Sequence, residues 1–334
     1  MPALAHVAIH PSQFPQQVRR DLVESLRHRK LNHKFLYDSL KQTRKWLALH
    51  QAYAPSRTDP DCEQTYERSF AAAAAGIATG QVHLIGLGCG GGQKDSRLLR
   101  LLRERGTDVH YTPVDVSAAM VLVAREVARA LVPEATCSPL VCDLATAEDL
   151  ADVFEQMTLE RFGRTQRPVR LFTFFGMLPN FEPQTILPRL ASLVGREAQL
   201  LVSANLAPGP DYAAGVRRIL PLYDNELTRD WLMTFLLDLG VESNDGELRF
   251  ELEEEPSALG LRRIAAHFQF RRAREIRVDE DRFEFGAGES IRLFFSYRHT
   301  PELVKTLLKQ HGLEVSQQWV TKSGEEGVFA ASQS

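Results

Sequence analysis

The chain has 334 residues, of which 44% are hydrophobic and 25% are charged. This length and composition allow a sizeable buried core in one large or two medium domains. The formal net charge is −3, and lysines and arginines are dispersed along the sequence. We therefore expect neither a nucleic acid nor an anionic membrane as a partner.

No apolar run approaches about 20 residues, and the N-terminal segment lacks the charged-then-apolar pattern of a signal peptide. The four cysteines, Cys62, Cys89, Cys137 and Cys142, show neither C-x-x-C spacing nor neighbouring histidines. This pattern favours free thiols in a reducing compartment and predicts no metal site. A cytoplasmic location is expected, and the oligomeric state is left open.

The N-terminal region reads as helical. Helices are expected over 17–29 and 34–50, followed by a fixed loop bracketed by Pro55 and Pro60. An alanine-rich helix over 65–78 then leads into the first strong strand signal, and its small side chains suit close packing against a neighbouring element.

Strand and helix patterns alternate between residues 81 and 205. The expected strands are 82–87, 110–114, 138–142, 169–175 and 198–204. The expected helices between them are 95–105, 117–131, 146–162 and 183–194. This alternation predicts an α/β fold with a parallel, doubly wound sheet and right-handed crossovers.

The alternation stops after residue 208. Helices are expected over 211–222 and 226–240, then strands over 247–253, 261–271, 274–278 and 290–297. A helix over 301–311 and strands over 313–320 and 326–331 would complete the sheet. We therefore predict a Rossmann-like domain of residues 60–208 and 297–334. An additional α+β substrate domain would comprise residues 1–59 and 209–296.

The segment Val82–Lys94 carries an apolar strand straight into a glycine-rich turn and a helix start. Gly88 and Gly90 would let the backbone approach a ligand closely, beside the free N–H groups of the first helical turn. Such a loop also fits a pyrophosphate-binding dinucleotide fold or a plain strand–helix turn, so further residues must decide.

Two aspartates decide in favour of a nucleoside ligand. Asp115 directly follows the next predicted strand, and Asp143 directly follows the one after it. Both would therefore face the glycine loop at the carboxyl edge of the sheet. Asp115 suits a ribose diol and Asp143 an adenine amino group, although an aspartate at a strand end can also cap the following helix. The order of these features is similar to that of Rossmann-like methyltransferases that use S-adenosylmethionine (SAM).

Rival classes are a nicotinamide oxidoreductase and a catalytically silent SAM-binding module. The oxidoreductase would need a second glycine-spaced turn and a hydride-transfer partner, and neither is visible in the sequence.

A more specific resemblance extends from Tyr37 to about Leu313. The segments that carry it are Leu36-Tyr37-Asp38, Tyr53 to Thr58, Gly88 to Lys94, Pro113 to Ser117, Phe175 to Phe181, Tyr223-Asp224 and Gly288 to Tyr297. Their order and spacing resemble the histidine-specific Nα-methyltransferases of ergothioneine biosynthesis, a family that includes relatives acting on prenylated tryptophan. For the SAM cofactor, the resemblance implies contacts from Gly88, Lys94, Asp115, Asp143 and Leu144.

The resemblance also implies a substrate site for a free amino acid. Asn180 matches the asparagine that holds the α-amino group, and Phe181 would form a wall beside it. Tyr223 matches a tyrosine that grips the α-carboxylate, and Tyr37 and Tyr53 match two more pocket tyrosines. Asn180 and Tyr53 are the predicted catalytic residues, although a single tyrosine at a helix packing face is as often plain core.

The chain departs from the family where the side chain of the substrate is recognised. Ser296 is kept, but Phe294 stands where histidine-specific members have a glutamate, and Ala266 stands where a methionine is expected. A phenyl ring cannot pair with a buried imidazole N–H, and an unpaired polar group costs about 1–3 kcal/mol. The sequence therefore predicts N-methylation of an amino acid with an apolar or aromatic, tryptophan-like side chain.

The alternative is a histidine Nα-methyltransferase that makes trimethylhistidine. In that case Phe294 would point into the core, and histidine would be bound through Ser296 and a water molecule.

Overall fold

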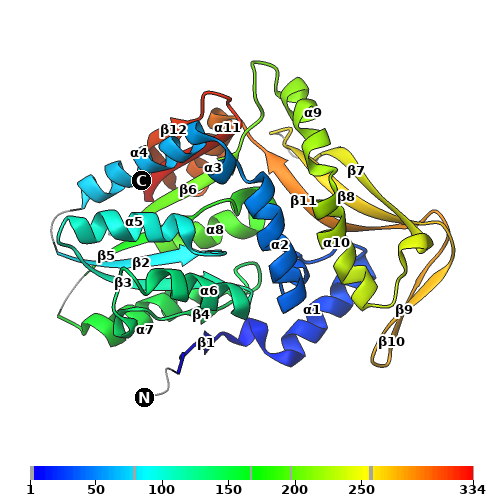
Figure 1. Ribbon diagram of the computed structural model, residues 1–334, viewed down its shortest axis with the longest axis horizontal. Helices are drawn as coiled ribbons and strands as arrows, with labels where there is room; N and C mark the ends of the chain where they lie inside the picture. Colours follow the sequence, from blue (N-terminus) through cyan, green and yellow to red (C-terminus); the bar gives the residue numbers. More distant parts are fainter. Residues whose placement is uncertain (1–3, 78–79, 166–167, 196–197, 256–258, 334) are drawn as a thin grey trace.

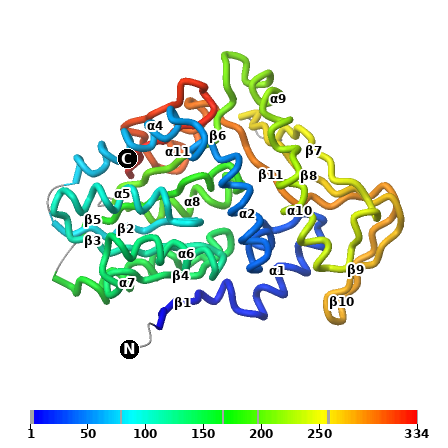
Figure 2. Tube along the Cα trace, viewed as in Figure 1, coloured from blue at the N-terminus to red at the C-terminus, as the bar shows by residue number. Residues whose placement is uncertain are grey.

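The computed structural model describes residues 4–77, 80–165, 168–195, 198–255 and 259–333. Figures 1 and 2 show a central sheet with helices on both faces, next to a smaller unit of antiparallel strands and helices. The strand order in the central sheet is β1-β4-β3-β2-β5-β6-β13-β12. Strands β1 to β6 run parallel, whereas β13 pairs antiparallel with both β6 and β12. The strands of this sheet are β1 (Ala8–Ile9), β2 (Gln81–Leu87), β3 (Asp108–Asp115), β4 (Leu140–Val141), β5 (Val169–Phe174), β6 (Ala198–Asn205), β12 (Leu313–Val320) and β13 (Glu326–Gln333).

Helices of the described residues pack on both faces of the central sheet. One core contains side chains of α4, α5 and α6, and the opposite core contains side chains of α7, α8 and α11. Their bounds are α4 (Pro60–Gly76), α5 (Gln93–Glu104), α6 (Ala118–Ala128), α7 (Leu150–Phe162), α8 (Pro183–Val194) and α11 (Pro301–Gln310). Successive strand residues serve the two cores alternately: Leu84 packs on the first side and Ile85 on the second, as the period of two requires.

The smaller unit has a three-stranded antiparallel sheet of order β11-β8-β7 and a separate hairpin, β9-β10. Its strands are β7 (Gly246–Glu254), β8 (Arg262–Phe270), β9 (Arg274–Val278), β10 (Asp281–Phe285) and β11 (Ser290–Arg298). The helices on this side are α1 (Pro15–His28), α2 (Leu40–Tyr53), α3 (Pro55–Thr58), α9 (Tyr212–Tyr223) and α10 (Glu226–Asp238). Short 3-10 helices are η1 (Pro11–Gln13), η2 (His33–Leu36), η3 (Glu134–Thr136), η4 (Leu178–Asn180) and η5 (Ser243–Asp245).

A single apolar core joins the N-terminal segment to the smaller unit. Leu26 and Phe35 pack with Trp231 of α10 and with Phe268 of β8, although some two hundred residues separate them in the chain. Strand β11 contributes to this core and also, through residues further along it, to the core of the central sheet. The cavity described below lies where these two units meet.

The structure confirms the α/β fold class, the parallel strands and the C-terminal completion of the central sheet. The division into two domains stays a prediction, and β1 qualifies it. This strand lies within residues 1–59 but pairs with β4 of the central sheet.

Several element predictions were wrong in detail. The segment between Pro55 and Pro60 is not a loop, because each proline opens a helix at its first position, where no N–H is needed. The helix expected over 34–50 begins only at Leu40, after a capping box formed by Ser39 and Gln42. The strand expected over 138–142 forms only at two residues, and the sequence prediction missed β1 and β10.

Candidate functional site

A cavity of about 490 Å³ lies at the carboxyl ends of the parallel strands. Its walls come from the glycine loop after β2, from the segments after β3, β4 and β5, and from the N-terminal segment between η2 and α3. The residues used below that line it are Asn32, His33, Lys34, Tyr37, Trp46, His50, Arg57, Gly88, Gly90, Lys94, Asp95, Asp115, Asp143, Leu144, Met177, Asn180 and Phe181. This is the edge at which open α/β sheets bind their ligands.

The glycine loop exposes bare backbone to the cavity. Gly88 and Gly90 have φ values of 67° and 51°, a region that side chains rarely allow. A Cβ atom built on Gly88 would lie 2.5 Å from the Met177 side chain. Residue 88 therefore has to be glycine, and at its glycines the loop presents backbone without side chains to the cavity.

Asp115 is fixed at the end of β3 by backbone donors. Its carboxylate accepts hydrogen bonds from the N–H groups of Gly90 and Ser117, each at 3.0 Å. The Ser117 hydroxyl, not Asp115, forms the N-cap of α6. Burial raises the pKa of Asp115 to about 6, although the backbone donors oppose this shift. The carboxylate is thus held rigidly at the cavity and titrates close to neutral pH.

Asp143 follows β4 and is also held in place. Its Oδ1 accepts a hydrogen bond from the Ala145 N–H at 2.8 Å. Its Oδ2 lies 3.4 Å from Asn32 Nδ2 and 3.4 Å from Lys34 Nζ. The next residue, Leu144, lines the cavity beside it.

Lys94 lies in the first turn of α5 and reaches the cavity from the other side of the loop. Its Nζ donates to the Tyr66 hydroxyl at 2.7 Å and lies 3.8 Å from a Glu326 carboxylate oxygen. The ammonium also sits 4.2 Å from the centre of the Tyr66 ring. Since an ammonium has three donors, Lys94 can still bind a ligand carboxylate.

Asn180 and Phe181 follow β5 through the short helix η4. The Asn180 Nδ2 donates to the Phe295 carbonyl oxygen at 2.8 Å, which fixes the orientation of the amide. Phe181 packs on Phe174, with ring centroids 5.8 Å apart. Asn180 can therefore present its Oδ1 as an acceptor to a donor in the cavity.

Aromatic rings from the N-terminal segment form a further wall, and Trp46 lies against the glycine loop, 3.3 Å from a Cβ atom built on Gly90. The Tyr37 ring packs edge-on against Trp46 at 5.9 Å, and Trp46 stacks on His50 at 4.8 Å. Burial first, then the charge of Asp115, raises the pKa of Tyr37 above its usual range, so its hydroxyl stays protonated.

Five predicted substrate residues do not line the cavity. Phe294 lies behind His33, whose ring stacks on it at 5.3 Å. Tyr223 donates to the Ser296 hydroxyl at 2.9 Å and accepts from Arg298 at 2.8 Å. Ala266 and Ser296 are buried, and Ala266 pairs with Phe294 in the sheet. The remaining one, Tyr53, is 53% exposed.

The sequence interpretation missed His33, Trp46 and His50. Trp46 and His50 are four residues apart, so they share one face of α2, and this spacing was a usable signal. Burial, with nearby cationic side chains, lowers the pKa of both His33 and His50 to about 3. Both imidazoles are therefore neutral near pH 7.

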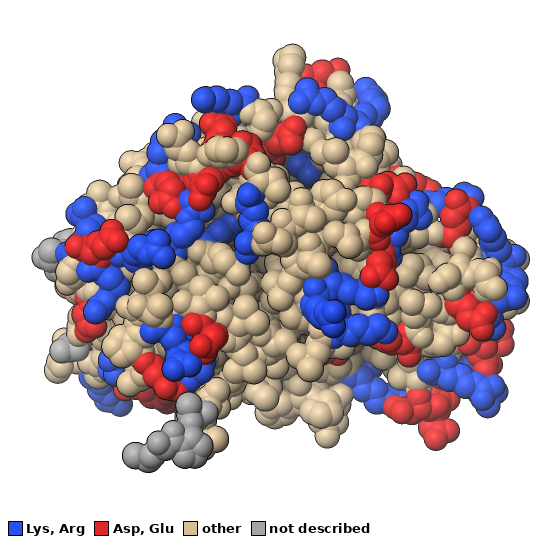
Figure 3. Space-filling model, viewed as in Figure 1, with Lys and Arg blue, Asp and Glu red and all other residues tan. Residues whose placement is uncertain are grey.

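Other classes of site find no support in the described residues. All four cysteines are free. In the described ranges, no group of three or more His, Cys, Asp or Glu side chains could hold a metal ion. No helix in that part of the chain combines the length and apolar character needed to cross a membrane. On the face shown in Figure 3, basic and acidic side chains are interspersed.

The sequence profile of a family described as histidine-specific, SAM-dependent methyltransferases matches residues 16–333. The chain belongs to this family. An N-methyltransferase of Aspergillus flavus, imqF, is 27% identical over 286 residues, which cover 82% of this chain and 73% of the relative. The methyltransferase therefore uses SAM as methyl donor, and the bare glycine loop with its two strand-end aspartates fits such a ligand.

Solved structures show more distant similarity. The CcbJ methyltransferase from Streptomyces caelestis is 14% identical, with a TM-score of 0.39, over 82% of this chain and 96% of that protein. A Burkholderia thailandensis 1,6-didemethyltoxoflavin-N1-methyltransferase is 13% identical, with a TM-score of 0.42, over 100% of this chain and 94% of that protein. These similarities are too low to carry an argument about the cavity.

Proposed function

We propose that this methyltransferase transfers the methyl group of SAM to the α-amino nitrogen of a free amino acid with an aromatic or apolar side chain. SAM supplies, when bound, an electrophilic methyl group on a sulfonium. Charge is dispersed during such a transfer, so proximity and orientation should provide most of the rate. The task of this chain is then to hold an amine in line with the methyl group.

Two walls of the cavity divide this task. The donor wall, which we assign to SAM, consists of Gly88, Gly90, Lys94, Asp115, Asp143 and Leu144. The acceptor wall, which we assign to the amino acid, consists of His33, Tyr37, Trp46, His50, Asn180 and Phe181. In this assignment Asp115 accepts from the ribose hydroxyls, Asp143 accepts from the adenine amino group, and Lys94 binds the carboxylate of the donor.

The oriented amide of Asn180 is the observation that carries the proposal. Its Nδ2 is engaged by the Phe295 carbonyl, so the Oδ1 is the atom left to accept a hydrogen bond from a substrate amine. Asn180 follows β5, the strand beside β2, and therefore lies at the same sheet edge as the glycine loop. An amine held there would lie next to the donor wall.

Tyr37 is our first choice for binding the substrate carboxylate. Tyr37 lines the cavity and its hydroxyl is protonated, so it can donate to an anion. The role of Tyr223 as a second carboxylate ligand stays a prediction. To act so, its hydroxyl would have to exchange the bonds that it makes with Ser296 and Arg298.

Aromatic surfaces support the choice of side chain. His33, Trp46 and Phe181 contribute aromatic rings to the cavity lining, and buried apolar area contributes roughly 25 cal/mol per Å². Aromatic pairs contribute about 0.5–1.5 kcal/mol beyond that area. In this arrangement Phe294 supports the wall by stacking behind His33, and Ala266 lies with Phe294 in the same core.

The proton of the substrate ammonium has no strong acceptor among the imidazoles of the cavity. With pKa values of about 3, His33 and His50 are too weakly basic to remove it. We therefore expect the neutral amine to be drawn from solution. Turnover should then rise with pH as the fraction of free amine increases.

A competition experiment tests the proposal. The protein is incubated with SAM and an equimolar mixture of amino acids, and methylated products are identified by mass spectrometry. We expect tryptophan or another aromatic or apolar amino acid to dominate. A dominant methylated histidine would overturn the side-chain assignment in favour of trimethylhistidine formation. If no product forms although S-adenosylhomocysteine raises the melting temperature, the chain is a silent SAM-binding module.

A further inference from the structure

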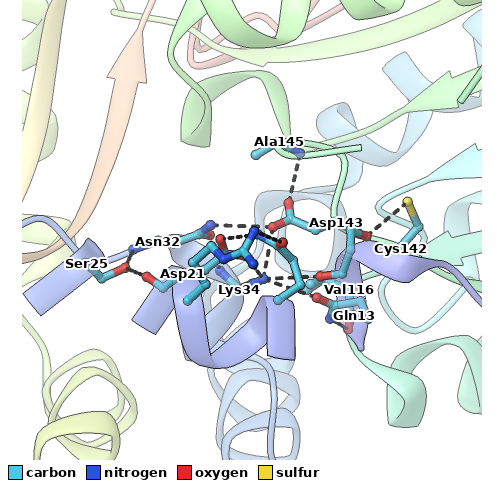
Figure 4. Close-up of polar contacts among 12 residues, drawn as sticks. Gln13, Asp21, Ser25, Asn32, Lys34, Val116, Cys142, Asp143 and Ala145 are labelled. Carbon is cyan, nitrogen blue, oxygen red and sulfur yellow. Dashed lines mark hydrogen bonds and ion pairs between the residues drawn. The ribbon is translucent and has the colours of Figure 1, made fainter. Parts of the chain in front are cut away.

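Lys34 places a buried ammonium between two carboxylates from distant parts of the chain. Its side chain is 3% exposed, and its Nζ forms an ion pair with Asp21 of α1. The same Nζ lies 3.4 Å from Oδ2 of Asp143, which follows β4. Figure 4 shows the Lys34 side chain among these groups. Because a buried charge is costly unless it is paired, these carboxylates together offset the cost of burying the Lys34 ammonium.

The surroundings of Asp143 leave it little freedom. Its Oδ1 accepts from the Ala145 N–H, and its Oδ2 faces Lys34 and the Asn32 amide. Its own backbone N–H donates to the Ser12 hydroxyl at 3.0 Å. A carboxylate offers about four acceptor positions. The contacts with Ala145, Asn32 and Lys34 use three of them and leave one for a ligand in the cavity.

The same N-terminal segment also fastens the neighbouring strand end. Gln13 Nε2 donates to the Val116 carbonyl oxygen at 2.8 Å, just after Asp115 (Figure 4). Gln13 Oε1 in turn lies 3.4 Å from Lys34 Nζ. Residues 12–34 therefore tie together the two loops that carry the aspartates of the donor wall.

We propose that Lys34, together with Asn32, is a positioning residue for the methyl donor. It holds the Asp143 carboxylate in the orientation that accepts the adenine amino group, and so makes the N-terminal segment a part of the donor site. This inference rests on the proposed assignment of Asp143 to adenine. It adds that the adenine selectivity of this chain depends on a lysine more than a hundred residues away in sequence.

A structural role alone is the competing explanation. The ion pair of Lys34 with Asp21 fastens α1, so loss of Lys34 could lower stability without any effect on ligand selectivity. Adenine selectivity separates the two explanations. S-inosylhomocysteine differs from S-adenosylhomocysteine in carrying a carbonyl oxygen where adenine has its amino group, and that oxygen cannot donate to Asp143.

The experiment measures the dissociation constants of both compounds by calorimetry, using the full chain. The wild type should bind S-adenosylhomocysteine at least about tenfold more tightly than the inosine compound. Lys34→Met should weaken binding of the adenine compound by about tenfold and leave the inosine compound nearly unchanged, so that the selectivity is lost. Lys34→Arg should restore most of it.

Asn32→Asp covers the case in which Lys34→Met does not fold. This substitution keeps the side-chain oxygen that accepts from the backbone N–H of Lys34 at 3.0 Å. It replaces the amide donor that faces Asp143 with a second negative charge. The selectivity should again fall. Asp21→Asn should lower the melting temperature but keep the selectivity. Lys41→Met removes an exposed lysine paired with Asp238 at 2.8 Å and should change neither quantity.

Two results would overturn the inference. If the folded Lys34→Met or Asn32→Asp protein keeps the wild-type selectivity, Lys34 has only a structural role. If the wild type itself does not distinguish the two compounds, Asp143 does not read adenine and the premise fails. Neither measurement uses an amino-acid substrate, so both still test the role of Lys34 even if the proposed methyl-transfer reaction is wrong.

Discussion

The two walls of the cavity are built by different physical means. On the donor wall, the Asp115 carboxylate is held by backbone N–H groups, and the glycine loop presents backbone directly. On the acceptor wall, rings are held by other rings, as in the stacking of His33 on Phe294 and of Trp46 on His50. The first arrangement depends on backbone geometry, and the second on the packing of side chains.

This difference has a functional consequence. Backbone hydrogen bonds at strand ends do not depend on the identity of the side chains around them, which suits a ligand that stays the same. Ring stacks can be repacked by substitution, which suits a specificity that varies. We therefore expect changes on the donor wall to alter donor affinity, and changes on the acceptor wall to alter turnover and substrate choice.

The strongest test of the donor wall is Gly88→Ala. The new methyl group would require a φ of 67° and would lie 2.5 Å from the Met177 side chain, so either the loop or Met177 must move. Affinity for S-adenosylhomocysteine should fall by more than about 100-fold. Gly106→Ala is the matched control, because Gly106 also has a positive φ but no atom within 4 Å of its Cβ position. It should lower the melting temperature only. Calorimetry that finds Gly88→Ala within about threefold of wild type would contradict the prediction.

The acceptor wall is tested by Asn180→Ala. Loss of the oriented Oδ1 should lower kcat/KM for the amino acid by about 50-fold, as expected for a hydrogen bond to a reacting amine. The affinity for S-adenosylhomocysteine should stay within about twofold, because Asn180 is assigned to the other wall. A parallel fall in both quantities would show that the two walls are not separate.

The pH dependence of donor binding sharpens the comparison. The pKa of Asp115 is raised to about 6, and in the proposed assignment the ribose hydroxyls bond more strongly to the ionised carboxylate than to the protonated acid, which has less acceptor capacity. The affinity for S-adenosylhomocysteine should therefore fall by about tenfold between about pH 7 and pH 5. Asp95 also lines the cavity with its pKa raised to about 6 by burial, so the Asp115→Asn profile is needed as a control. That variant should bind weakly with little pH dependence; an unchanged slope would assign the effect to another group.

The donor wall could be predicted from sequence because its signals are local. A strand followed by Gly88 and Gly90, with Asp115 and Asp143 at the ends of the next strands, places these groups at one sheet edge by topology alone. No local motif marks Lys34, because its partner Asp143 is distant in the chain and only the tertiary fold brings the two side chains together.

The orientation of β11 could not be predicted in the same way. A register shift between Arg292 and Phe294 breaks the period of two, and residues 291–298 are all buried, so no alternation marks a cavity face. A shift of one residue reverses the faces of a strand. The family resemblance placed Phe294 and Ser296 at the substrate; in the structure neither lines the cavity, and their substrate roles stay predictions.

The smallest expected effect concerns Tyr53, to which the family resemblance assigns a catalytic role that is untested. This residue is 53% exposed at the end of α2, and its hydroxyl makes no hydrogen bond to the described residues. Tyr53→Phe should therefore change turnover by less than about twofold, whereas Tyr37→Phe, which removes the hydroxyl of a residue that lines the cavity, should lower it by about tenfold. Steady-state kinetics with the amino acid found by competition would compare them. If Tyr53→Phe lost as much activity as Tyr37→Phe, the end of α2 would have to close over the acceptor wall during catalysis, and that wall would then depend on motion as well as packing.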